Sequence, residues 1–341
     1  MASEFELIRR FFAESSHQFQ RSEVILGIGD DAAVLEIPKG QQLCVATDVL
    51  IADVHFPADA PADLIAHRAL AVNLSDLAAM GAAPLCFTLG LAVNEVSEAW
   101  MERFSGGLFD LAQQYNCPLV GGDTVRGPLS ISITVHGLVD KTVMIRRHGA
   151  VVGDKILVSG FLGDGALALL AMGLDSHLVA SKVLMQGEIP MNCRDTFLAA
   201  FFQPKPRIKL AQACATLVSC GIDLSDGLVS DLGHILMANG LGASINVDAL
   251  PISSAARSFA DSKLSHAAAL FGGDDYELCL CVPPENLSAV KSIANSLAID
   301  LSCVGEITKN TDLYLHDSRG MKLDFDQSSY AHFVNPIQAE R

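Results

Sequence analysis

The chain has 341 residues, of which 50% are hydrophobic and 18% charged, and its formal net charge is −16. This apolar content excludes a disordered chain, and because single cores stop growing at roughly 250–300 residues, two domains are expected. So acidic a chain is repelled by nucleic acid and by anionic membranes, and we expect neither as a partner. Soluble cytoplasmic proteins are often this acidic, and the more specific hypothesis is that part of the negative charge binds metal ions.

The N-terminal segment and the cysteines indicate a cytoplasmic protein. Residues 1–16 carry acids among their apolar side chains, which excludes a signal peptide and predicts an amphipathic helix. No apolar run reaches the ~20 residues needed to span a bilayer. The nine cysteines include no C-x-x-C pair, as expected of reduced thiols in a cytoplasm.

The first half of the chain alternates strands and helices. Residues 43–48 predict a strand that ends at Asp48. A helix is expected from Pro61 to Met80, because proline favours a first turn and Gly81 follows directly.

Three further elements are expected before residue 140. Ser97 can cap a helix that runs to Tyr115. Residues 118–123 predict a short strand that leads into a turn. Residues 129–139 alternate apolar and polar side chains and predict a half-buried strand.

The pattern breaks at 146–154, where we place a boundary between domains 1–148 and 149–341. Beyond it, strands and helices continue to alternate, which predicts an α/β (α+β) fold with mixed sheets flanked by helices. The expected elements are strands at 155–160, 242–248 and 276–282, helices at 164–173, 206–219 and after Pro284, and a strand-turn-helix unit at 221–237.

Two short motifs recur at similar separations. Asp76 of NLSD and Asp123 of GGD are 47 residues apart, and Asp226 of DLSD and Asp274 of GGD are 48 residues apart. The spacing favours a duplicated half, and chance is the alternative.

Acidic residues recur at predicted strand ends and glycine turns. Loops at strand ends are where α/β folds build sites, and gathered carboxylates suit Mg²⁺, which bridges carboxylates to phosphates. We interpret them as a site for several Mg²⁺ ions and a polyphosphate. Taken singly, each motif is equally typical of a turn or a helix cap, with Ser75 and Ser225 as candidate caps. The segments are 27–31, 47–48, 74–76, 121–123, 222–227 and 271–275.

Several common catalytic motifs are absent. There is no G-x-x-x-x-G-K-[ST] phosphate loop, no H-R-D or D-F-G set and no G-x-S-x-G elbow, and GIGDDA fails the G-x-G-x-x-G pattern. Histidine is sparse near the acids, which argues against a zinc hydrolase.

Six segments in this order resemble the thiamine-monophosphate kinases and cover nearly the whole chain. The wider superfamily includes aminoimidazole ribonucleotide synthetase, selenophosphate synthetase and a hydrogenase maturation protein. The resemblance implies ATP-dependent phosphorylation of thiamine monophosphate to thiamine diphosphate, by a homodimer whose N-terminal sheets pair and bind ATP near their interface. The segments are LGIGDDAAV (26–34), VATDVLIADVHF (45–56), HRALAVNLSDLAAMGAAP (67–84), VGGDTVRGPLSISITVHG (120–137), IDLSDGLVSDLGHI (222–235) and FGGDDYELC (271–279).

The resemblance also implies roles for individual residues. Those matching Mg²⁺ ligands are Asp31, Thr47, Asp48, Asp76, Asp123, Asp223 and Asp226. Those matching ATP contacts are Gly122, Asp123, Arg147 and Ser225, and those matching the thiamine phosphate site are His55, Asp274 and Phe325. No general base or covalent nucleophile is expected, because the acceptor phosphate is largely dianionic at neutral pH.

The chain departs from the family pattern at three positions: Asp274 replaces a usual Glu, Phe325 a frequent Trp, and Ser105 a frequent Tyr. Alternatives also stay open for single residues. Phe325 fits core packing, His55 fits a loop histidine with local partners, and Arg146 competes with Arg147 for the phosphate.

The pair Asp30 and Asp31 poses a separate question. In an extended segment adjacent side chains point to opposite faces, so only one of the two should lead into the metal cluster. The family pattern favours Asp31, which leaves Asp30 to hydrogen-bond the turn or to reach a metal-bound water.

Three rival functions remain at this stage. One is another synthetase of the same superfamily. The second is a Mg²⁺-dependent phosphohydrolase indifferent to thiamine monophosphate, and the third is a module that binds Mg-ATP without turnover.

Overall fold

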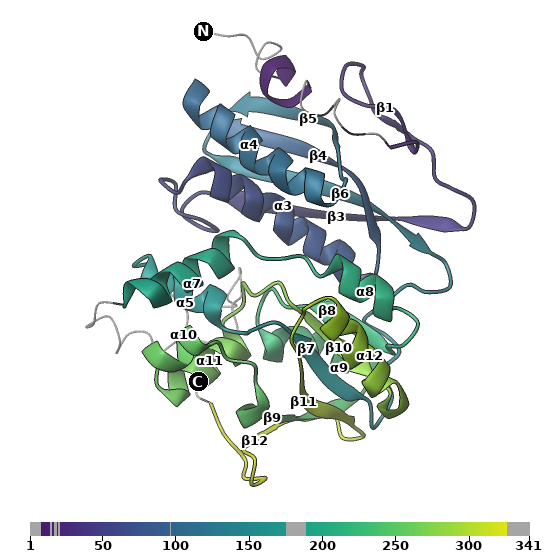
Figure 1. Cartoon of the computed structure of the whole chain (residues 1–341), viewed down its shortest axis with the longest axis vertical. Helices are drawn as coiled ribbons and strands as arrows, with labels where there is room; N and C mark the ends of the chain where they lie inside the picture. The colour runs from purple at the N-terminus through teal and green to yellow at the C-terminus, as the bar shows by residue number, and fades with distance from the viewer. Residues whose placement is uncertain are drawn as a thin grey trace, which may run out of the picture. The chain divides into compact units, whose positions relative to one another are not determined.

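The computed structural model describes residues 8–13, 16, 19, 21–95, 97–174 and 189–325. The chain divides into two compact units (Figure 1). The first comprises Met1–Ile145 and Phe202–Thr216, and the second Arg146–Phe201 and Leu217–Arg341. No feature of the sequence indicated that the segment Phe202–Thr216 groups with the first unit.

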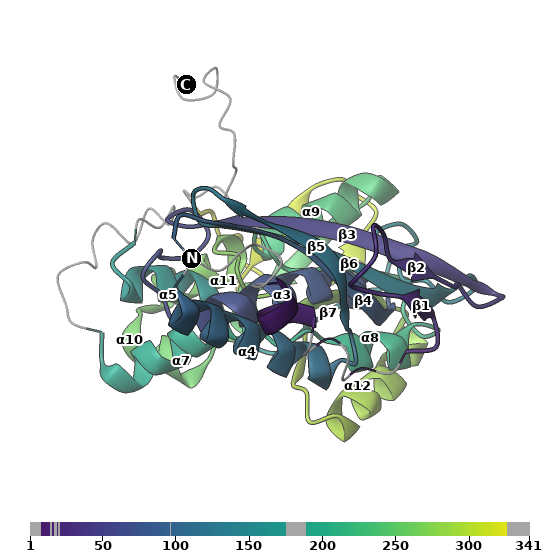
Figure 2. The same ribbon diagram turned by 90° about the horizontal axis from the view of Figure 1, so that it is seen from above.

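The first unit is built on a four-stranded mixed sheet with the strand order β3-β6-β4-β5. Strands β4 and β5 are parallel and the other neighbours are antiparallel, as predicted for a mixed sheet. Figure 2 shows helices α3 and α4 on one side of this sheet. The strands are β3 (Gln41–Ile51), β4 (Ala83–Val93), β5 (Leu119–Arg126) and β6 (Ser130–Asp140), and the helices are α3 (Ala62–Ala79), α4 (Glu98–Gln114) and α8 (Ile208–Cys214).

The helices begin and end where the sequence signals predict. Pro61 precedes the first residue of α3, and Gly81 just beyond its end adopts φ +67°, a conformation that favours glycine. The Ser97 hydroxyl accepts a hydrogen bond from the Trp100 N–H at 3.4 Å and caps α4. The predictions for both helices are therefore confirmed.

A hairpin covers part of the other face of the sheet. Strands β1 (Val24–Leu26) and β2 (Val34–Leu35) are antiparallel. Partly buried side chains of this hairpin region, Val24, Leu35 and Ile37 among them, pack against a buried cluster of Leu85, Cys86, Val120 and Leu138. Of the predicted N-terminal helix, the described residues include η1 (Ile8–Ala13), a short π-helix.

Elsewhere this outer face exposes apolar side chains. Along β3 the even-numbered residues from Cys44 to Leu50 face the helices and are partly or fully buried. The odd-numbered side chains from Leu43 to Ile51 are exposed, Val45 to 56% and Val49 to 50%. The strand therefore presents an apolar stripe to its surroundings.

The second unit contains a six-stranded mixed sheet with the strand order β12-β9-β11-β7-β10-β8. In this sheet β12 and β9 are parallel, and the other neighbouring strands are antiparallel. Its strands are β7 (Lys155–Ser159), β8 (Cys220–Asp223), β9 (Gly242–Asn246), β10 (Leu278–Val282), β11 (Leu301–Thr308) and β12 (Leu313–His316). Its helical segments are α5 (Asp164–Ala171), α7 (Met191–Phe202), α9 (Leu228–Asn239), η2 (Val247–Ala249), α10 (Ser254–Phe259), α11 (Ser262–Phe271), η3 (Pro284–Asn286) and α12 (Leu287–Ser296).

Two element predictions are wrong. The strand expected at 118–123 does not lead into a turn after Asp123, because β5 continues its pairing with β4 and ends only at Arg126. The helix expected at 206–219 is limited to α8, because the following residues enter β8, where the Ser219 N–H already donates to the Cys281 carbonyl.

The repeated motifs do not occupy equivalent places. Ser75 and Asp76 lie inside α3, whereas Ser225 and Asp226 lie in the loop between β8 and α9. Asp123 lies in β5, but Asp274 lies in a loop before β10. Neither Ser75 nor Ser225 is a helix cap, since Ser75 is buried within its helix and Gly227 precedes α9 without a side-chain cap.

All nine cysteines are free thiols, seven of them buried. In the part of the chain that the structure describes, no helix is both long and apolar enough to cross a membrane.

Candidate functional site

A cavity of about 500 Å³ lies between the loop before β2 and the strand β5. The loop contributes Asp30 and Asp31, and the strand contributes Gly122 and Asp123. Three residues predicted to bind metal or nucleotide are therefore brought together: Asp31, Gly122 and Asp123. Phe12 and Leu119 form part of its apolar wall.

Both members of the acidic pair line this cavity, and which of the two binds a metal ion stays a prediction. The segment is not extended: Gly29 adopts φ +129° and residues 31–32 form a bend, so the alternation of strand side chains does not apply. The Asp30 carboxylate accepts a hydrogen bond from the Asp31 N–H at 2.9 Å. This confirms the predicted hydrogen-bonding role of Asp30.

Gly122 is required by a close approach of two backbones. A Cβ at this position would lie 2.0 Å from the Leu89 carbonyl oxygen of β4, which no side chain permits. Because β5 is an edge strand, one side of its backbone is not paired within the sheet and can donate N–H groups to a ligand. The exposed Asp123 follows directly.

A second acidic group lies between β3 and α3. The Asp48 N–H donates to the Asn73 side-chain oxygen at 2.9 Å, and the Asn73 amide donates to the Ala69 carbonyl at 2.9 Å. Asp76 is three residues beyond Asn73 and therefore lies on the same face of the helix. Sequence reasoning missed Asn73, whose signal was a buried amide within the NLSD motif.

Thr47 points to the opposite face of β3 from Asp48. Its hydroxyl lies 2.8 Å from the hydroxyl of Thr134, its cross-strand neighbour in β6. Asp48 and Asp123 lie on the two edge strands of the sheet, three strand spacings apart, or about 14 Å. The predicted ligands of the first unit thus form two groups, one around the cavity and one beside α3.

His55 lies in a loop fixed by local hydrogen bonds. Its Nδ1 accepts a hydrogen bond from the Ile51 N–H at 3.0 Å. Asp53, with φ +62°, accepts a hydrogen bond from the Ala58 N–H at 3.0 Å. A neutral His55 with Nδ1 as acceptor carries its proton on Nε2, which makes Nε2 the donor.

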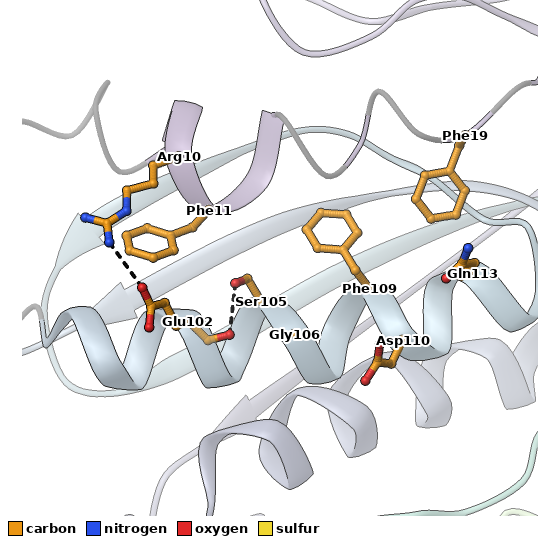
Figure 3. Close-up of a pocket in the computed structure, with 9 residues that line it drawn as sticks. All are labelled: Arg10, Phe11, Phe19, Glu102, Ser105, Gly106, Phe109, Asp110 and Gln113. Atoms are coloured by element: carbon orange, nitrogen blue, oxygen red, sulfur yellow. Dashed lines mark hydrogen bonds and ion pairs between the residues drawn. The ribbon is translucent and has the colours of Figure 1, made fainter.

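Ser105 lines a second cavity, of about 330 Å³ (Figure 3). Its hydroxyl donates to the Glu102 carbonyl at 3.2 Å within α4. The rings of Phe11, Phe19 and Phe109 form aromatic walls, and Phe19 and Phe109 lie 6.3 Å apart between centroids. Sequence reasoning missed these rings, because the contact joins η1 and Phe19 to a helix about 90 residues later.

In the second unit, the loop after β8 holds Asp223, Ser225 and Asp226. The Asp226 N–H donates to the Asp231 carboxylate of α9 at 3.0 Å. Burial, together with the charges of Asp226 and Asp223, raises the pKa of Asp231 to about 7, although hydrogen bonds from the loop backbone oppose the shift. Asp231 supports this loop, and the sequence signal for it was an acid in the first turn of α9.

Two backbone hydrogen bonds join this loop to the one carrying Asp274. The Asp274 N–H donates to the Ser225 carbonyl at 2.8 Å, and the Tyr276 N–H donates to the Leu224 carbonyl at 2.7 Å. The structure therefore brings the predicted nucleotide residue Ser225 and the predicted substrate residue Asp274 together.

Phe325 lies near the same loop. Its ring packs against Phe271 at 5.7 Å between centroids, three residues before Asp274. This contact agrees with the packing role of Phe325 and leaves its substrate role a prediction.

Arg147 is exposed, as is Arg146. Its carbonyl accepts a hydrogen bond from the Asn239 side chain at 2.9 Å, and the same side chain accepts from the Gly149 N–H at 2.8 Å. Asn239 thus fixes the backbone of this segment, while the choice between the two arginines stays a prediction.

The arrangement of the acids suits a Mg²⁺ ion that is also bound by phosphate oxygens. It suits less well a metal ion whose ligands are all protein side chains. Among the described residues, no three His, Cys, Asp or Glu side chains gather closely enough to hold a metal ion by themselves. Mg²⁺ commonly takes one or two carboxylates and completes its octahedron with water and phosphate oxygens. The pairs of acids in each unit match that requirement.

The comparisons with known proteins agree with this architecture. Residues 29–139 match the model of the AIR synthase related protein, N-terminal domain, and residues 151–318 match that of the C-terminal domain. HypE of Escherichia coli, a hydrogenase maturation protein, is 22% identical with a TM-score of 0.71, which shows the shared fold alone. These matches define the class: a two-domain protein of the AIR synthase related type.

Closer relatives identify the family. The thiamine-monophosphate kinase of Salmonella typhimurium is 43% identical over 98% of this chain and 99% of its own length. A crystal structure of thiamine-monophosphate kinase from Stenotrophomonas maltophilia is 39% identical with a TM-score of 0.81, and covers 92% of this chain and 96% of its own. AaThiL complexed with AMPPCP and TMP is 27% identical with a TM-score of 0.73, at 97% of both chains. The chain belongs to the thiamine-monophosphate kinase family and is an enzyme of the kinase class.

Proposed function

We propose that this enzyme transfers the γ-phosphoryl group of ATP to thiamine monophosphate and so forms thiamine diphosphate. The observation that carries the proposal is the cavity in which Asp31 and Asp123 flank the glycine-containing edge of β5. This arrangement offers carboxylates and backbone N–H groups to a polyphosphate. The names of the relatives and the AMPPCP and TMP complex of AaThiL support the choice of substrates.

The metal ligands are proposed from the same groups. Mg²⁺, when bound, would neutralise and align the two phosphate anions. Asp31 and Asp123 would hold it at the cavity, Asp48 and Asp76 beside α3, and the second unit would contribute two further acids. The full proposed set is Asp31, Thr47, Asp48, Asp76, Asp123, Asp223 and Asp226.

The remaining contacts follow the chemistry of the substrates. The Gly122 backbone, Asp123, Arg147 and Ser225 would contact ATP. The thiazolium of thiamine monophosphate is cationic, so Asp274 and the Phe325 ring suit it by charge pairing and cation–π attraction. The Nε2–H group of His55 would donate a hydrogen bond to the substrate.

The aromatic cavity around Ser105 suits the base of ATP. Its phenylalanine rings offer flat apolar walls, and Gln113 and Ser105 offer hydrogen-bonding groups at its lining. Where relatives often carry Tyr, the smaller Ser105 leaves this space open. Replacement of Phe109 by Ala should raise the KM for ATP and leave the KM for thiamine monophosphate unchanged.

The phosphoryl transfer is proposed to be direct and in line. The acceptor is a phosphate monoester with a second pKa of about 6, so at neutral pH its oxygen attacks without a general base. The chain's task is to position the two anions and to exclude water. Stereochemical analysis should show inversion at phosphorus, and net retention would overturn direct transfer.

We further infer a cytoplasmic homodimer. The exposed apolar stripe of β3 supports pairing of the sheets of two copies, because a face of this kind is normally covered by a partner. The nine free thiols support a reducing compartment.

The deciding experiment is an assay of the purified protein with Mg-ATP. Thiamine diphosphate should form from thiamine monophosphate, whereas thiamine should not be phosphorylated. Release of phosphate from ATP at a rate indifferent to thiamine monophosphate would instead show a phosphohydrolase. Binding of Mg-ATP without any turnover would show a binding module.

A further inference from the structure

The loop that carries Asp274 has an unfavourable backbone conformation. Asp274 adopts φ +60° and Tyr276 adopts φ +49°, in the left-handed region that residues with a side chain rarely occupy. Such conformations persist where the surrounding structure holds them, and they gather at ligand sites. The contacts of the residue between them, Asp275, show what holds this loop.

One side of the loop is held by its neighbour after β8. The N–H groups of Asp274 and Tyr276 donate to the carbonyls of Ser225 and Leu224 in the loop after β8. These two hydrogen bonds hold the Asp274 loop on the side that faces the loop after β8.

The other side of the loop meets the turn before α5. The Asp275 carboxylate accepts a hydrogen bond from the Gly163 N–H at 2.8 Å. A Cβ on Gly165 would lie 2.3 Å from the Asp274 carbonyl oxygen, so the first turn of α5 packs directly on the Asp274 backbone. Asp275 therefore ties the loop to the element against which Asp274 is packed.

The second oxygen of Asp275 lies in a buried, acidic environment. Oδ2 is buried and has no hydrogen-bond partner among the described residues. The neighbouring acids Asp164 and Glu277 accept hydrogen bonds from the hydroxyls of Ser253 and Ser159. Burial, with the charges of Asp164, Glu277 and Asp274, raises the pKa of Asp275 well above its usual value. The contact that Asp275 makes with the turn before α5 is therefore its hydrogen bond from the Gly163 N–H.

We propose that Asp275 is a positioning residue for the thiamine monophosphate site: by accepting the Gly163 N–H, it holds Asp274 in the conformation that presents its carboxylate. This proposal rests on the proposed function, in which Asp274 pairs with the thiazolium. It assigns to the second acid of the GGDD motif a role distinct from that of the first.

The test compares two substitutions at one position. Asp275→Ala removes the acceptor, and the kcat/KM for thiamine monophosphate should fall by roughly tenfold or more, while the KM for ATP stays unchanged. Asp275→Asn keeps an oxygen for the Gly163 N–H and adds no charge, so it should retain most of the activity. Hydrogen exchange of the Gly163 amide should be faster in Asp275→Ala and close to that of the unmodified protein in Asp275→Asn.

A control variant separates positioning from stability. Ser253→Ala removes the hydroxyl that Asp164 accepts and the cap of α10, so it should lower Tm without changing the KM for thiamine monophosphate. Equal losses toward both substrates in Asp275→Ala, or an Asp275→Asn variant as impaired as Asp275→Ala, would overturn the proposal.

A third variant separates this proposal from the proposed function. If Asp274→Ala raises the KM for thiamine monophosphate and Asp275→Ala does not, the positioning role fails while the site stands. If neither variant changes that KM, the assignment of the site itself fails.

Discussion

The adjacent carboxylates Asp30 and Asp31 both line the cavity, yet their surroundings differ. Asp30 already accepts a hydrogen bond from the Asp31 N–H, whereas Asp31 is the member of the pair that we propose as a Mg²⁺ ligand. We therefore expect Asp31→Asn to lower kcat by at least roughly a hundredfold, and Asp30→Asn by less than about tenfold, since an amide oxygen can replace the acceptor. Steady-state kinetics at several Mg²⁺ concentrations measure both effects.

The Mg²⁺ dependence is the control for this pair. The Asp31→Asn variant should need more Mg²⁺ for its residual activity, and Asp30→Asn should keep the unmodified dependence. Equal catalytic losses with intact metal binding in both variants would contradict the division of roles.

His67 of α3 makes stability depend on pH. Burial lowers its pKa, although a hydrogen bond with the Pro204 backbone and the charge of Asp110 act in the opposite direction. As the pH falls through about 6.5, the unfolded chain takes up a proton on this ring before the folded chain does, so the free energy of unfolding decreases. His67→Gln should reduce the fall in Tm between about pH 7 and pH 5. The exposed His148→Gln is the matched control, and an equal change in it would refute the assignment to His67.

At the level of whole elements, β5 depends on a glycine. The Cβ of an alanine at position 122 would lie 2.0 Å from the Leu89 carbonyl oxygen, so β4 and β5 would have to separate. Gly122→Ala should lower the free energy of unfolding by about 2–3 kcal/mol and abolish ATP binding, because it also displaces the backbone at the cavity. Thermal melting and calorimetric titration with Mg-ATP would show both losses.

Gly121→Ala is a control within the same strand. A Cβ there would meet only the Thr88 methyl group, at 3.9 Å, an ordinary contact. If both glycine variants bind ATP like the unmodified protein, the close approach of β4 and β5 has no role in the site.

Elements with local boundary signals could be predicted from the sequence, and those defined by distant partners could not. Helix α3 was predicted almost to the residue from Pro61 and Gly81, because both residues act within one turn of the helix ends. Strand β5 was predicted to end at Asp123, and its last three residues were missed because they pair with β4 residues 33 positions earlier in the chain. Gly122 lies within the predicted strand, and the need for a glycine there comes from the same partner strand.

The same distinction applies to the candidate site. The acids themselves were found from motifs, but their supports were not. Asn73 and Asn239 bond to residues that only the fold brings near, whereas Asp231 bonds to Asp226, five residues before it, and its local signal was missed. The bend at Asp31 was missed because alternation assumes an extended backbone, which the conformation of Gly29 interrupts. Short sequence motifs were therefore enough to select the candidate site residues, but only the fold shows which of them lie close together.

At the level of the whole molecule, the proposed metal ligands of the first unit lie on opposite edge strands of its sheet, so a single chain does not bring them together. Thr47 points to the exposed face of β3, and it lies about 14 Å from Asp123 on β5 in one chain, too far for both to bind one ion. In a symmetric dimer whose sheets face each other across a two-fold axis along the strands, β3 of one copy lies beside β5 of the other. The exposed stripe of Val45 and Val49 on β3 agrees with such a contact.

This arrangement predicts complementation between two impaired variants. Thr47→Val and Asp123→Asn should each lose most activity alone, but a mixture that exchanges subunits should recover about a quarter of full activity, because half of the dimers are mixed and one of their two sites is intact.

Asp31→Asn mixed with Asp123→Asn is the control. Both acids line the cavity of one chain, so every site of a mixed dimer carries one defect and no activity should return. Asp31→Asn mixed with Thr47→Val should recover activity like the first mixture. No recovery in either mixture containing Thr47→Val, with subunit exchange verified by native mass spectrometry, would place Thr47 and Asp123 in the site of a single chain.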